Sequence, residues 1–484
     1  MKWPGVALGA LGALGALVAA CTDPAPVFAP AIDVPKNPGA QPPTLDDLTM
    51  AVAHEGDVDD LVSATFTQGK NVEIAGVPFG TDLVVHLTGF VGTAEVAYGR
   101  TCSFAISADT PAPPTHLYFA AEVKFGDLAT VPAQRSDGAA ITYHDGSGLF
   151  VGGVDAGGNP VAEVERFDPR TGELDSLATL APRTGAAVAL VGTGGDAQVA
   201  VIGGLDPSGA GAQFIELIEA DNPPASRVTT IVDTNIERTA STATSLTDGS
   251  VVVIGGNDPA TGVSRSVDEI VLANGTAEVH PLGAQLAIPR YGHTATRLGD
   301  DLGASVLIAG GLDATNMPVA KAELYKPLSM GFSLMFMFDM QDPRTQHHAV
   351  LMPDGSVLVI GGVDAAGPTK HLELFTLDTG FTPVGDLPDN AGLVDFTSTT
   401  LPDGRVLLTG GRATVGGPPL STAFIAQLDP VDGTVEVIPT TSLSTPRAGH
   451  QATLLCDGTV LVTGGSDDAS APAERYNPPS LDRR

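Results

Sequence analysis

Seven pairs of adjacent glycines recur through most of this chain and constrain its fold more than any other feature. The first glycines of the pairs are 49 to 55 residues apart, and they are Gly152, Gly203, Gly255, Gly310, Gly361, Gly410 and Gly464. Each pair ends a short apolar run such as "VLVI" or "VLLT". A nearly constant period of about fifty residues indicates a repeat architecture, in which each unit packs against its neighbours.

Each repeat carries the signals of short antiparallel strands. The apolar runs are usually entered through a dipeptide such as Asp354-Gly355, which predicts a tight hairpin. An apolar residue 11 to 14 positions after the second glycine marks a third strand, in turn Phe167, Ile218, Ile270, Tyr325, Phe375, Phe424 and Tyr476. A fourth strand then leads to the next repeat. No sustained helical periodicity is present, so the chain is predicted to be all-β.

Several stretches resemble one known repeat family. "IPRYGHTATRL" and "TPRAGHQATLL" are similar to the first strand of the kelch repeat, and "VLVIGG" is similar to the second. The resemblance covers roughly residues 116 to 480. It implies a seven-bladed kelch-like β-propeller, with one blade for each glycine pair. The repeats are divergent, because the fourth-strand tryptophan of the family is missing from all of them and the only tryptophan is Trp3.

In such a propeller the glycine pairs have a structural explanation. The second strand of each blade ends beside the crowded channel, where neighbouring blades leave no room for a Cβ atom. Glycine also permits the positive φ that lets the chain turn outward. We therefore interpret the pairs as structural, and not as phosphate-binding or catalytic motifs.

The ring needs a strand to close it. The last repeat supplies strands at about 450–455, 459–463 and 473–477, and its fourth strand must come from elsewhere in the chain. We expect residues 116–125, "HLYFAAEVKF", to fill that place and so to remove two exposed sheet edges.

Charged residues recur at two positions of six repeats. An arginine stands at the start of the first strand, and an acid stands two residues before the third-strand apolar position. The predicted pairs are Arg135 with Glu165, Arg183 with Glu216, Arg238 with Asp268, Arg290 with Glu323, Arg344 with Glu373, and Arg447 with Glu474. One repeat lacks both, since residues 389–396 contain no arginine and Thr422 takes the place of the acid. We predict buried ion pairs within each blade instead of a ligand-binding arginine ring; the alternative is coincidence in degenerate repeats.

The sequence gives little support for a metal site or a catalytic site. His293, His347 and His450 follow their arginines by three residues, and we interpret them as packing residues, with metal ligation as the alternative. Turns such as "LPDGRVLLTGG" look like those of the copper radical oxidases. That resemblance implies a copper site of two histidines, a tyrosine, and a second tyrosine crosslinked to cysteine. No residue set of this chain transfers to it, and no run resembles the sialidase aspartate box. No cofactor, metal or catalytic residue is assigned.

The loops that follow the glycine pairs are the expected binding surface. They connect the second and third strands on the face that also carries the channel mouth, and loops on a rigid scaffold commonly bind ligands. An aspartate follows six of the pairs and is predicted to form turns: Asp155, Asp206, Asp258, Asp313, Asp364 and Asp467.

The N-terminus predicts export and a lipid anchor. Lys2 precedes an apolar stretch of signal-peptide length that is too short and glycine-rich for a good membrane span. Residues 18–21, "VAAC", resemble the bacterial lipobox, which implies a signal peptide over 1–21 with lipidation at Cys21; the alternative is an ordinary signal peptide. Thr22 favours the outer membrane, with the displayed face undecided. Seven prolines within residues 22–44 predict an extended spacer.

Residues 45–115 differ in character from the repeats and predict a small β-sandwich, immunoglobulin-like in a loose sense. Leu83, Val85 and Leu87 alternate with Val84, His86 and Thr88, as on a strand with one buried face. The propeller then spans 116–484. Cys102 in the sandwich and Cys456 in a hairpin turn are expected on one face of the ring. A disulfide between them is possible after export, although the sequence favours two separate thiols.

Composition narrows the range of partners. The formal net charge is −32, so a phosphate backbone would be repelled and nucleic acid is not an expected partner. We predict an envelope-anchored monomer that acts in recognition or scaffolding and binds a protein or a glycan through the propeller loops. The alternative is a propeller enzyme, a copper radical oxidase or a hydrolase, with an unrecognised site; the fold alone does not decide between them.

Overall fold

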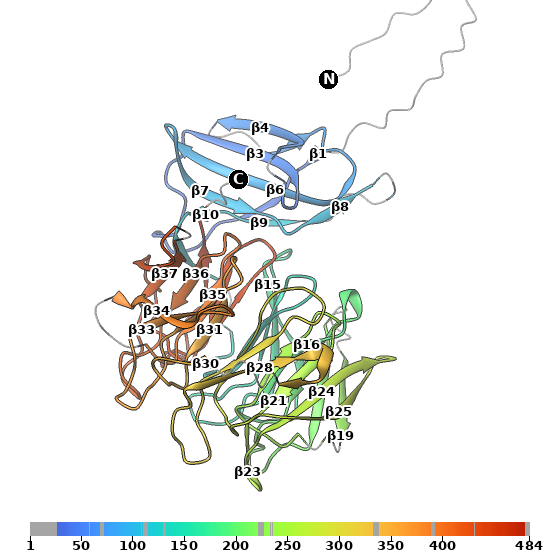
Figure 1. Ribbon diagram of the computed structural model, residues 1–484. Helices are drawn as coiled ribbons and strands as arrows, with labels where there is room; N and C mark the ends of the chain where they lie inside the picture. Colours follow the sequence, from blue (N-terminus) through green and yellow to red (C-terminus); the bar gives the residue numbers. More distant parts are fainter. Residues whose placement is uncertain are drawn as a thin grey trace, which may run out of the picture.

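Antiparallel strands make up nearly all of the regular structure (Figure 1). The computed structural model describes residues 27–57, 59–67, 72–107, 109, 115–128, 132–220, 227–232, 234, 236–332, 338–388, 393–429 and 431–479. The helices within these ranges are short 3-10 turns, which include η1 (Gly194–Asp196) and η2 (Pro327–Ser329). Cys21, the rest of the predicted signal peptide and the first residues of the predicted spacer lie outside the described ranges.

Seven sheets follow one another along the repeats, and each contains at least four strands. In the first six the strands lie in sequence order, whereas the seventh takes its fourth strand from early in the chain. The first three are β12 (Ala139–Thr142), β13 (Gly148–Val151), β14 (Glu163–Asp168), β15 (Glu173–Thr179); β16 (Ala187–Val191), β17 (Gln198–Ile202), β18 (Phe214–Glu219), β19 (Arg227–Val232); and β20 (Thr242–Ser245), β21 (Val251–Ile254), β24 (Ser266–Ala273), β25 (Thr276–Gln285). The third sheet also carries a small hairpin of β22 (Asn257–Asp258) and β23 (Gly262–Val263).

The remaining sheets repeat this order. They are β26 (Thr294–Arg297), β27 (Val306–Ala309), β28 (Lys321–Lys326), β29 (Gly331–Phe332), with β30 (Phe338–Asp339) also on β28; β31 (His348–Leu351), β32 (Val357–Ile360), β33 (His371–Thr376), β34 (Gly380–Asp386); β35 (Thr397–Thr400), β36 (Val406–Thr409), β37 (Ala423–Leu428), β38 (Val435–Pro439); and β39 (Gln451–Leu454), β40 (Val460–Thr463), β41 (Glu474–Asn477), β11 (Lys124–Asp127).

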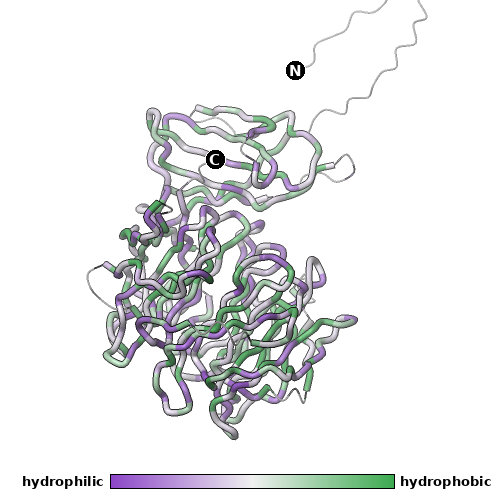
Figure 2. Tube along the Cα trace, in the orientation of Figure 1, coloured by the Kyte–Doolittle hydropathy of each residue, from purple (hydrophilic) through white to green (hydrophobic). Residues whose placement is uncertain are grey.

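The innermost strands form a closed circle. β12, β16, β20, β26, β31, β35 and β39 contact one another in that order, and β39 contacts β12 again. The second strands are mainly apolar, and six of the seven are buried along their whole length because sheets cover them on both faces. In β17 the first residue, Gln198, is only partly buried. Figure 2 shows the alternation of hydrophobic and hydrophilic stretches along the trace. The arrangement is that expected of a β-propeller.

The circle is closed by a strand from early in the chain. β11 pairs antiparallel with β41, so that Phe125 lies opposite Tyr476. The expectation that residues 116–125 form this strand needs correction. His116–Tyr118 (β9) and Ala120–Ala121 (β10) pair with strands of the N-terminal part, and only Lys124–Asp127 reaches the seventh sheet.

The glycine pairs make room for the neighbouring sheet. A Cβ atom on Gly310 would lie 2.5 Å from the carbonyl oxygen of Arg344 and 2.4 Å from Cε1 of His347, both in the next sheet. The second glycine, Gly311, donates its N–H to the Arg344 carbonyl at 2.9 Å. Both glycines have positive φ, 63° and 83°. The pair therefore joins adjacent sheets through a contact that a side chain would block.

One junction departs from this pattern. The equivalent hydrogen bond forms between all other neighbouring sheets, at 2.8 to 2.9 Å, but the described residues show none from Gly153 to the Arg183 carbonyl. A Cβ atom on Gly152 would meet nothing within 4 Å, and a narrow cavity lies between β12 and β16. The first and second sheets are thus less tightly joined than the others.

The N-terminal part forms a separate sheet beside the ring (Figure 1). Its order is β10, β7 (Ala94–Arg100), β6 (Gly80–Val91), β3 (Asp47–His54), β4 (Val62–Thr67), and β8 (Phe104–Ile106) also pairs with β6. The alternation in β6 buries Leu83, Val85 and Leu87 completely, in a core that also contains Phe28 and Phe119.

The predicted spacer needs correction, because part of it folds. β1 (Val27–Phe28) pairs with β5 (Ile74–Ala75), and β2 (Ala31–Asp33) lies parallel to β9. Phe28 stacks on Phe104 with ring centroids 5.1 Å apart. The buried phenylalanine and the strand partner offset the extended preference of the prolines, so residues 27–44 belong to the folded N-terminal part.

Candidate functional site

The six predicted charge pairs meet inside their sheets. Arg135 lies 2.7 Å from Glu165, Arg238 2.6 Å from Asp268, Arg290 2.8 Å from Glu323, Arg344 2.9 Å from Glu373 and Arg447 3.2 Å from Glu474, and Arg183 also bonds Glu216. All twelve residues are buried. Burial lowers the pKa of Arg344, and the adjacent Glu373 opposes this effect.

Each pair ties the start of the first strand to the third strand. Arg344 donates from Nη1 to the carbonyl oxygens of Gly361 and His371, at 3.2 and 2.7 Å. Glu373 accepts the backbone N–H of Gln341 at 2.7 Å. Their polar atoms are thus engaged within the sheet, and the geometry gives these pairs a structural task with no charge directed toward a ligand.

The sixth sheet replaces the ion pair with apolar side chains. Leu393 stands where the other sheets have arginine, because its carbonyl accepts the N–H of Gly362 at 2.9 Å. The register pairs Phe424 with Leu408, as Glu373 pairs with Val359. Phe424, and not Thr422, therefore takes the place of the acid, and the prediction was wrong by two residues because the third strand is shifted relative to its glycine pair.

The three histidines are buried between sheets. Nε2 of His347 lies 3.0 Å from Oγ1 of Thr294, and Nε2 of His293 lies 3.1 Å from Oγ1 of Thr242. His450 approaches Thr397 and Thr409, both at 2.9 Å. Burial lowers the pKa of each histidine to about 3, assisted by the nearby arginine. They remain neutral at physiological pH.

A collar of left-handed residues surrounds the channel mouth. The residue two positions after each arginine, or after Leu393, has a φ between 50° and 64°, and these residues are Asp137, Gly185, Ala240, Gly292, Gln346, Asp395 and Gly449. Backbone bonds link several of them around the ring, including Gly449 N–H to Asp395 at 2.7 Å and Asp137 N–H to Gly449 at 2.8 Å. Glycine occupies only three of the seven positions. The sequence signal was this shared offset, which motif reasoning missed.

A cavity of about 390 Å³ opens inside this collar, over the sheets numbered five, six, seven and one. Asp137, Gln346, His348, Asp395 and Gln451 line it. His348 donates or accepts at Ser398 Oγ, 2.8 Å away, and burial lowers its pKa to about 4. The cavity therefore presents two carboxylates, two amides and neutral imidazoles.

A larger cavity of about 760 Å³ lies where β31–β32 and β35–β36 turn, on the other face of the ring. Its polar side chains satisfy one another. Asp354 accepts from Ser356 at 2.6 Å, Asp403 pairs with Arg405 at 2.5 Å, and Gln427 donates to Glu436 at 3.1 Å. We therefore regard the mouth as the better candidate site.

Turn-forming aspartates line the outer loops of the mouth face. Oδ1 accepts a backbone N–H two residues ahead at Asp155, Asp206, Asp258, Asp313 and Asp364. In the seventh sheet Asp468, and not the predicted Asp467, makes this bond, to Ser470 at 2.8 Å. The hydroxyl of Thr315, together with backbone N–H groups, lowers the pKa of the exposed Asp313 carboxyl. The Oδ1 atoms are thus engaged within the turns.

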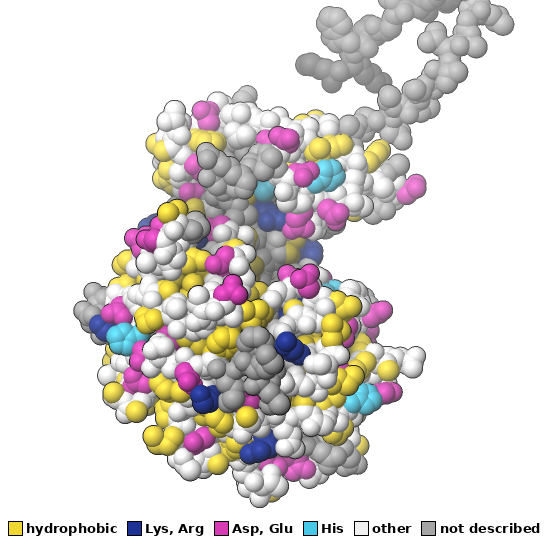
Figure 3. All heavy atoms as spheres, viewed as in Figure 1, with side chains coloured by type: hydrophobic (Ala, Val, Ile, Leu, Met, Phe, Trp, Pro, Cys, Tyr) yellow, Lys and Arg dark blue, Asp and Glu magenta, His cyan; other side chains and the backbone are white. Residues whose placement is uncertain are grey.

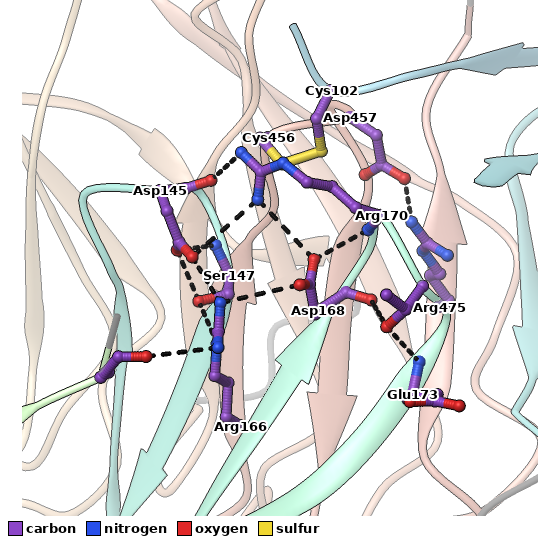
Figure 4. A network of polar contacts seen from close by, with 12 residues as sticks. Cys102, Asp145, Ser147, Arg166, Asp168, Arg170, Glu173, Cys456, Asp457 and Arg475 are labelled. Carbon is purple, nitrogen blue, oxygen red and sulfur yellow. Dashed lines mark hydrogen bonds and ion pairs between the residues drawn. A yellow bond between two sulfur atoms is a disulfide. The ribbon is translucent and has the colours of Figure 1, made fainter. Parts of the chain in front are cut away.

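Cys102 and Cys456 form a disulfide with Cα atoms 5.0 Å apart (Figure 4). Separate thiols, which the sequence favours, do not occur here because the β9–β11 segment places the N-terminal part against the turns of the first and seventh sheets. The turn around Gly146 adjoins the bridge, and a Cβ there would lie 2.2 Å from Cβ of Cys456. The disulfide joins the two parts of the molecule.

Arg475 supports the same interface, and Arg166 holds the nearby turn of the first sheet (Figure 4). Arg166 bonds Asp145 at 2.5 Å and Ser147 at 3.0 Å. Arg475 bonds Asp457 and stacks 4.3 Å above the ring of Tyr118. Burial lowers the pKa of Arg475 to about 10. Asn477 adds hydrogen bonds to the carbonyls of Tyr98 and Ala120, both at 3.0 Å. The contact is therefore fixed by hydrogen bonds and a cation–π contact in addition to the disulfide.

Comparison with known proteins shows the fold. No protein-family model and no curated protein matches the chain. A solved structure described as a novel fungal alcohol oxidase with catalytic diversity among the AA5 family, in complex with copper, matches with a TM-score of 0.51 and 17% identity, over 74% of this chain and 76% of that one. The structure of YjhT matches with a TM-score of 0.43 and 13% identity, over 60% of this chain and 93% of that one. The chain thus shares the β-propeller fold of the oxidase.

The residues of this chain do not fit the copper site implied by that resemblance. Cys102 and Cys456 are joined to each other, so neither is available for a bond to tyrosine. His293, His347 and His450 are held by threonines in three different sheet junctions. In the described residues no three histidine, cysteine, aspartate or glutamate side chains gather as metal ligands. We derive no copper chemistry from this fold.

Proposed function

We propose that the protein is an envelope-anchored recognition or scaffolding lipoprotein that binds its ligand at the propeller mouth. In this proposal residues 1–21 are a signal peptide lipidated at Cys21, a small β-sandwich follows, and a seven-bladed kelch-like propeller occupies the rest. The seven sheets, each with at least four strands, and their closed inner circle support the propeller. No helix within the described ranges is long and apolar enough to cross a bilayer.

The observation that carries the binding function is the cavity inside the collar. It combines a rigid ring with polar side chains that converge from four sheets, and the side chain of Asp137 makes no hydrogen bond or ion pair among the described residues, although its backbone N–H bonds Gly449. Concave sites with a few convergent polar groups are the usual ligand sites of proteins. A protein or a glycan of the cell envelope is the proposed ligand.

The acidic surface agrees with this assignment. Figure 3 shows acidic side chains scattered over the visible face of both parts, with few basic ones. Such a surface keeps an exported protein soluble and repels nucleic acid. We propose a monomer held at the bacterial outer membrane.

Capture from the producing cell tests the binding proposal. The full-length protein and a Gln346→Arg variant, which places a long cationic side chain in the mouth, are incubated with solubilised envelope and with a glycan array. Gln427→Arg, which lines the larger cavity on the other face, is the matched control. We expect a protein or glycan that the wild type and Gln427→Arg retain and Gln346→Arg loses. Equal capture by all three would contradict binding at the mouth.

The lipid anchor has its own test. Metabolic labelling with an alkyne-bearing fatty acid should mark the wild type and not Cys21→Ser, and membrane fractionation should release only the variant. Labelling of both proteins would contradict lipidation at Cys21.

A propeller enzyme is the second candidate, and the shared fold with an alcohol oxidase is the observation that favours it. Metal analysis of protein purified from copper-supplemented cells discriminates it. One equivalent of copper, with oxygen consumption on a panel of primary alcohols, would replace the recognition proposal. Copper far below one equivalent would support it.

A further inference from the structure

We propose that the channel mouth binds the protonated amine of its ligand, with Asp137, Asp395 and Gln451 as acceptors. This inference rests on the proposed function, because it names the chemical class recognised by the same cavity. Each of the three residues lines that cavity.

The two aspartates flank one glycine of the collar. Gly449 donates its N–H to the carbonyl of Asp395 and accepts the N–H of Asp137. A Cβ atom on Gly449 would lie 2.7 Å from Oδ1 of Asp137, so the absence of a side chain at 449 leaves space for this carboxylate. The collar thus fixes the backbone of both acids on either side of the seventh sheet.

The Asp137 carboxylate lacks a cation of its own. Its side chain is reached by solvent, yet desolvation within the mouth and then the negative charge of Asp395 raise the pKa of its carboxyl. Asp395 does have a partner, Arg412, whose Nε lies 3.3 Å from Oδ2. Two carboxylates therefore share one guanidinium, and a bound cation would balance the charge of the second carboxylate.

An independent observation identifies the third acceptor. Gln451 is 2% exposed and lines the same cavity, and its Oε1 has no hydrogen-bond partner among the described residues. Its Nε2 donates to the carbonyl of Ala139 at 2.7 Å, which fixes the amide. A buried carbonyl oxygen without a donor loses free energy that a bound N–H would restore.

The chemistry of these acceptors selects an organic ammonium. An ammonium group offers three N–H donors and no acceptor, which matches two carboxylates and one amide oxygen. His347, His348 and His450 border the cavity but are neutral, so they do not repel a cation. A metal ion is the poorer occupant, since no three ligating side chains gather in the described part of the chain.

Saturation-transfer NMR on the full-length protein tests the inference with n-butylammonium chloride as the probe and 1-butanol as its neutral counterpart. The variants are Asp137→Asn and Asp395→Asn. Asparagine adopts the left-handed conformation as readily as aspartate does, so the collar is preserved. Asp175→Asn, at an exposed position on β15, changes the charge equally and is the control.

We expect transfer to butylammonium but not to butanol, with binding weakened about tenfold in each mouth variant and unchanged in Asp175→Asn. Equal transfer to butanol, or butylammonium binding that survives both mouth substitutions, would overturn the inference. If envelope capture depends on Gln346 but butylammonium does not bind, the recognition proposal stands and only the ammonium class of ligand is refuted. Amine binding without envelope capture would refute the recognition proposal instead.

Discussion

The sixth sheet has the same backbone geometry as the other six sheets, but it uses apolar side chains where they use charged ones. Six sheets join their first and third strands through a buried arginine and an acid, whereas Leu393 and Phe424 pack at the same two positions in the sixth. The carbonyl of Leu393 still accepts the N–H of Gly362, as five of the six arginine carbonyls accept the N–H of their glycine. The ion pair is therefore one of two ways to fill this position, and its charges are not needed for the shape of the ring.

Breaking one ion pair should have the largest effect. Arg344→Met leaves Glu373, 1% exposed, without a cation, and we expect a loss of about 3–5 kcal/mol in the free energy of unfolding. Urea unfolding followed by circular dichroism measures it. Arg405→Met removes an exposed pair with Asp403 and should cost less than about 1 kcal/mol. Equal losses in both variants would show that the buried pair has no special importance.

The loose junction offers a second contrast within the ring. Gly203 and Gly152 share the same strained backbone, with φ of 63° and 65°. A Cβ on Gly203 would lie 2.3 Å from the Arg238 carbonyl, whereas one on Gly152 meets nothing within 4 Å. We expect Gly203→Ala to destabilise by about 1–3 kcal/mol more than Gly152→Ala, because only the former overpacks its junction. Differential scanning calorimetry compares them, and a greater loss for Gly152→Ala would contradict the open junction.

The sheets should also differ in how much they contribute to the loss of stability in acid. Phe396 packs against Gly361 at the position where, in another sheet, the titratable His347 packs against Gly310. Burial lowers the pKa of His347 from 6.5 to about 3, so between these values only the unfolded chain takes up the proton. Stability is therefore lost as pH falls below about 6.5, by up to about 1.4 kcal/mol per pH unit for this group.

His347→Phe should remove that contribution. Urea unfolding at pH 7, 6, 5 and 4 should give a pH slope for the variant that is smaller by about 1 kcal/mol per unit than that of the wild type. His280→Phe, at a half-exposed position, should leave the slope unchanged. An identical slope for His347→Phe would indicate that this imidazole is not buried.

The smallest effect is expected when the ion pair of another sheet is replaced by the two apolar side chains found in the sixth sheet. The double variant Arg344→Leu, Glu373→Phe removes both charges together, and we expect its stability within about 1–2 kcal/mol of the wild type, because apolar pairs commonly replace buried ion pairs at little cost. The residual loss reflects the carbonyls of Gly361 and His371, which lose a donor. A double variant no more stable than Arg344→Met would show that the sixth sheet depends on further substitutions.

The repeat pattern allowed much of the ring to be predicted. Period, hairpin dipeptides and glycine pairs are local signals, and the joint loss of arginine and acid pointed to the odd sheet. The shift that brings Phe424 into register was hidden, because strand register depends on partners and not on distance along the chain. The strands near Phe28 and Ile32 were missed because seven prolines dominate their surroundings, and their partners lie some 45 to 90 residues away.

The candidate site was harder to foresee. Its residues come from four sheets, and no motif groups Asp137, Asp395 and Gln451. Asp137 and Asp395 share a left-handed backbone conformation, which aspartate reveals less clearly than glycine does, whereas Gln451 lies on β39. The disulfide was left open for a similar reason, since its two cysteines are 354 residues apart and only the folded β9–β11 segment brings them together.

The pairing of β11 with β41 has a consequence for biosynthesis. Lys124–Asp127 emerges from the ribosome long before Glu474–Asn477, so one sheet edge stays without its neighbour while the intervening repeats are made. Cys102 likewise awaits Cys456, 354 residues further along the chain. A chain truncated before the seventh sheet would leave both unsatisfied, so synthesis of that sheet is the step that allows the ring to be sealed and crosslinked.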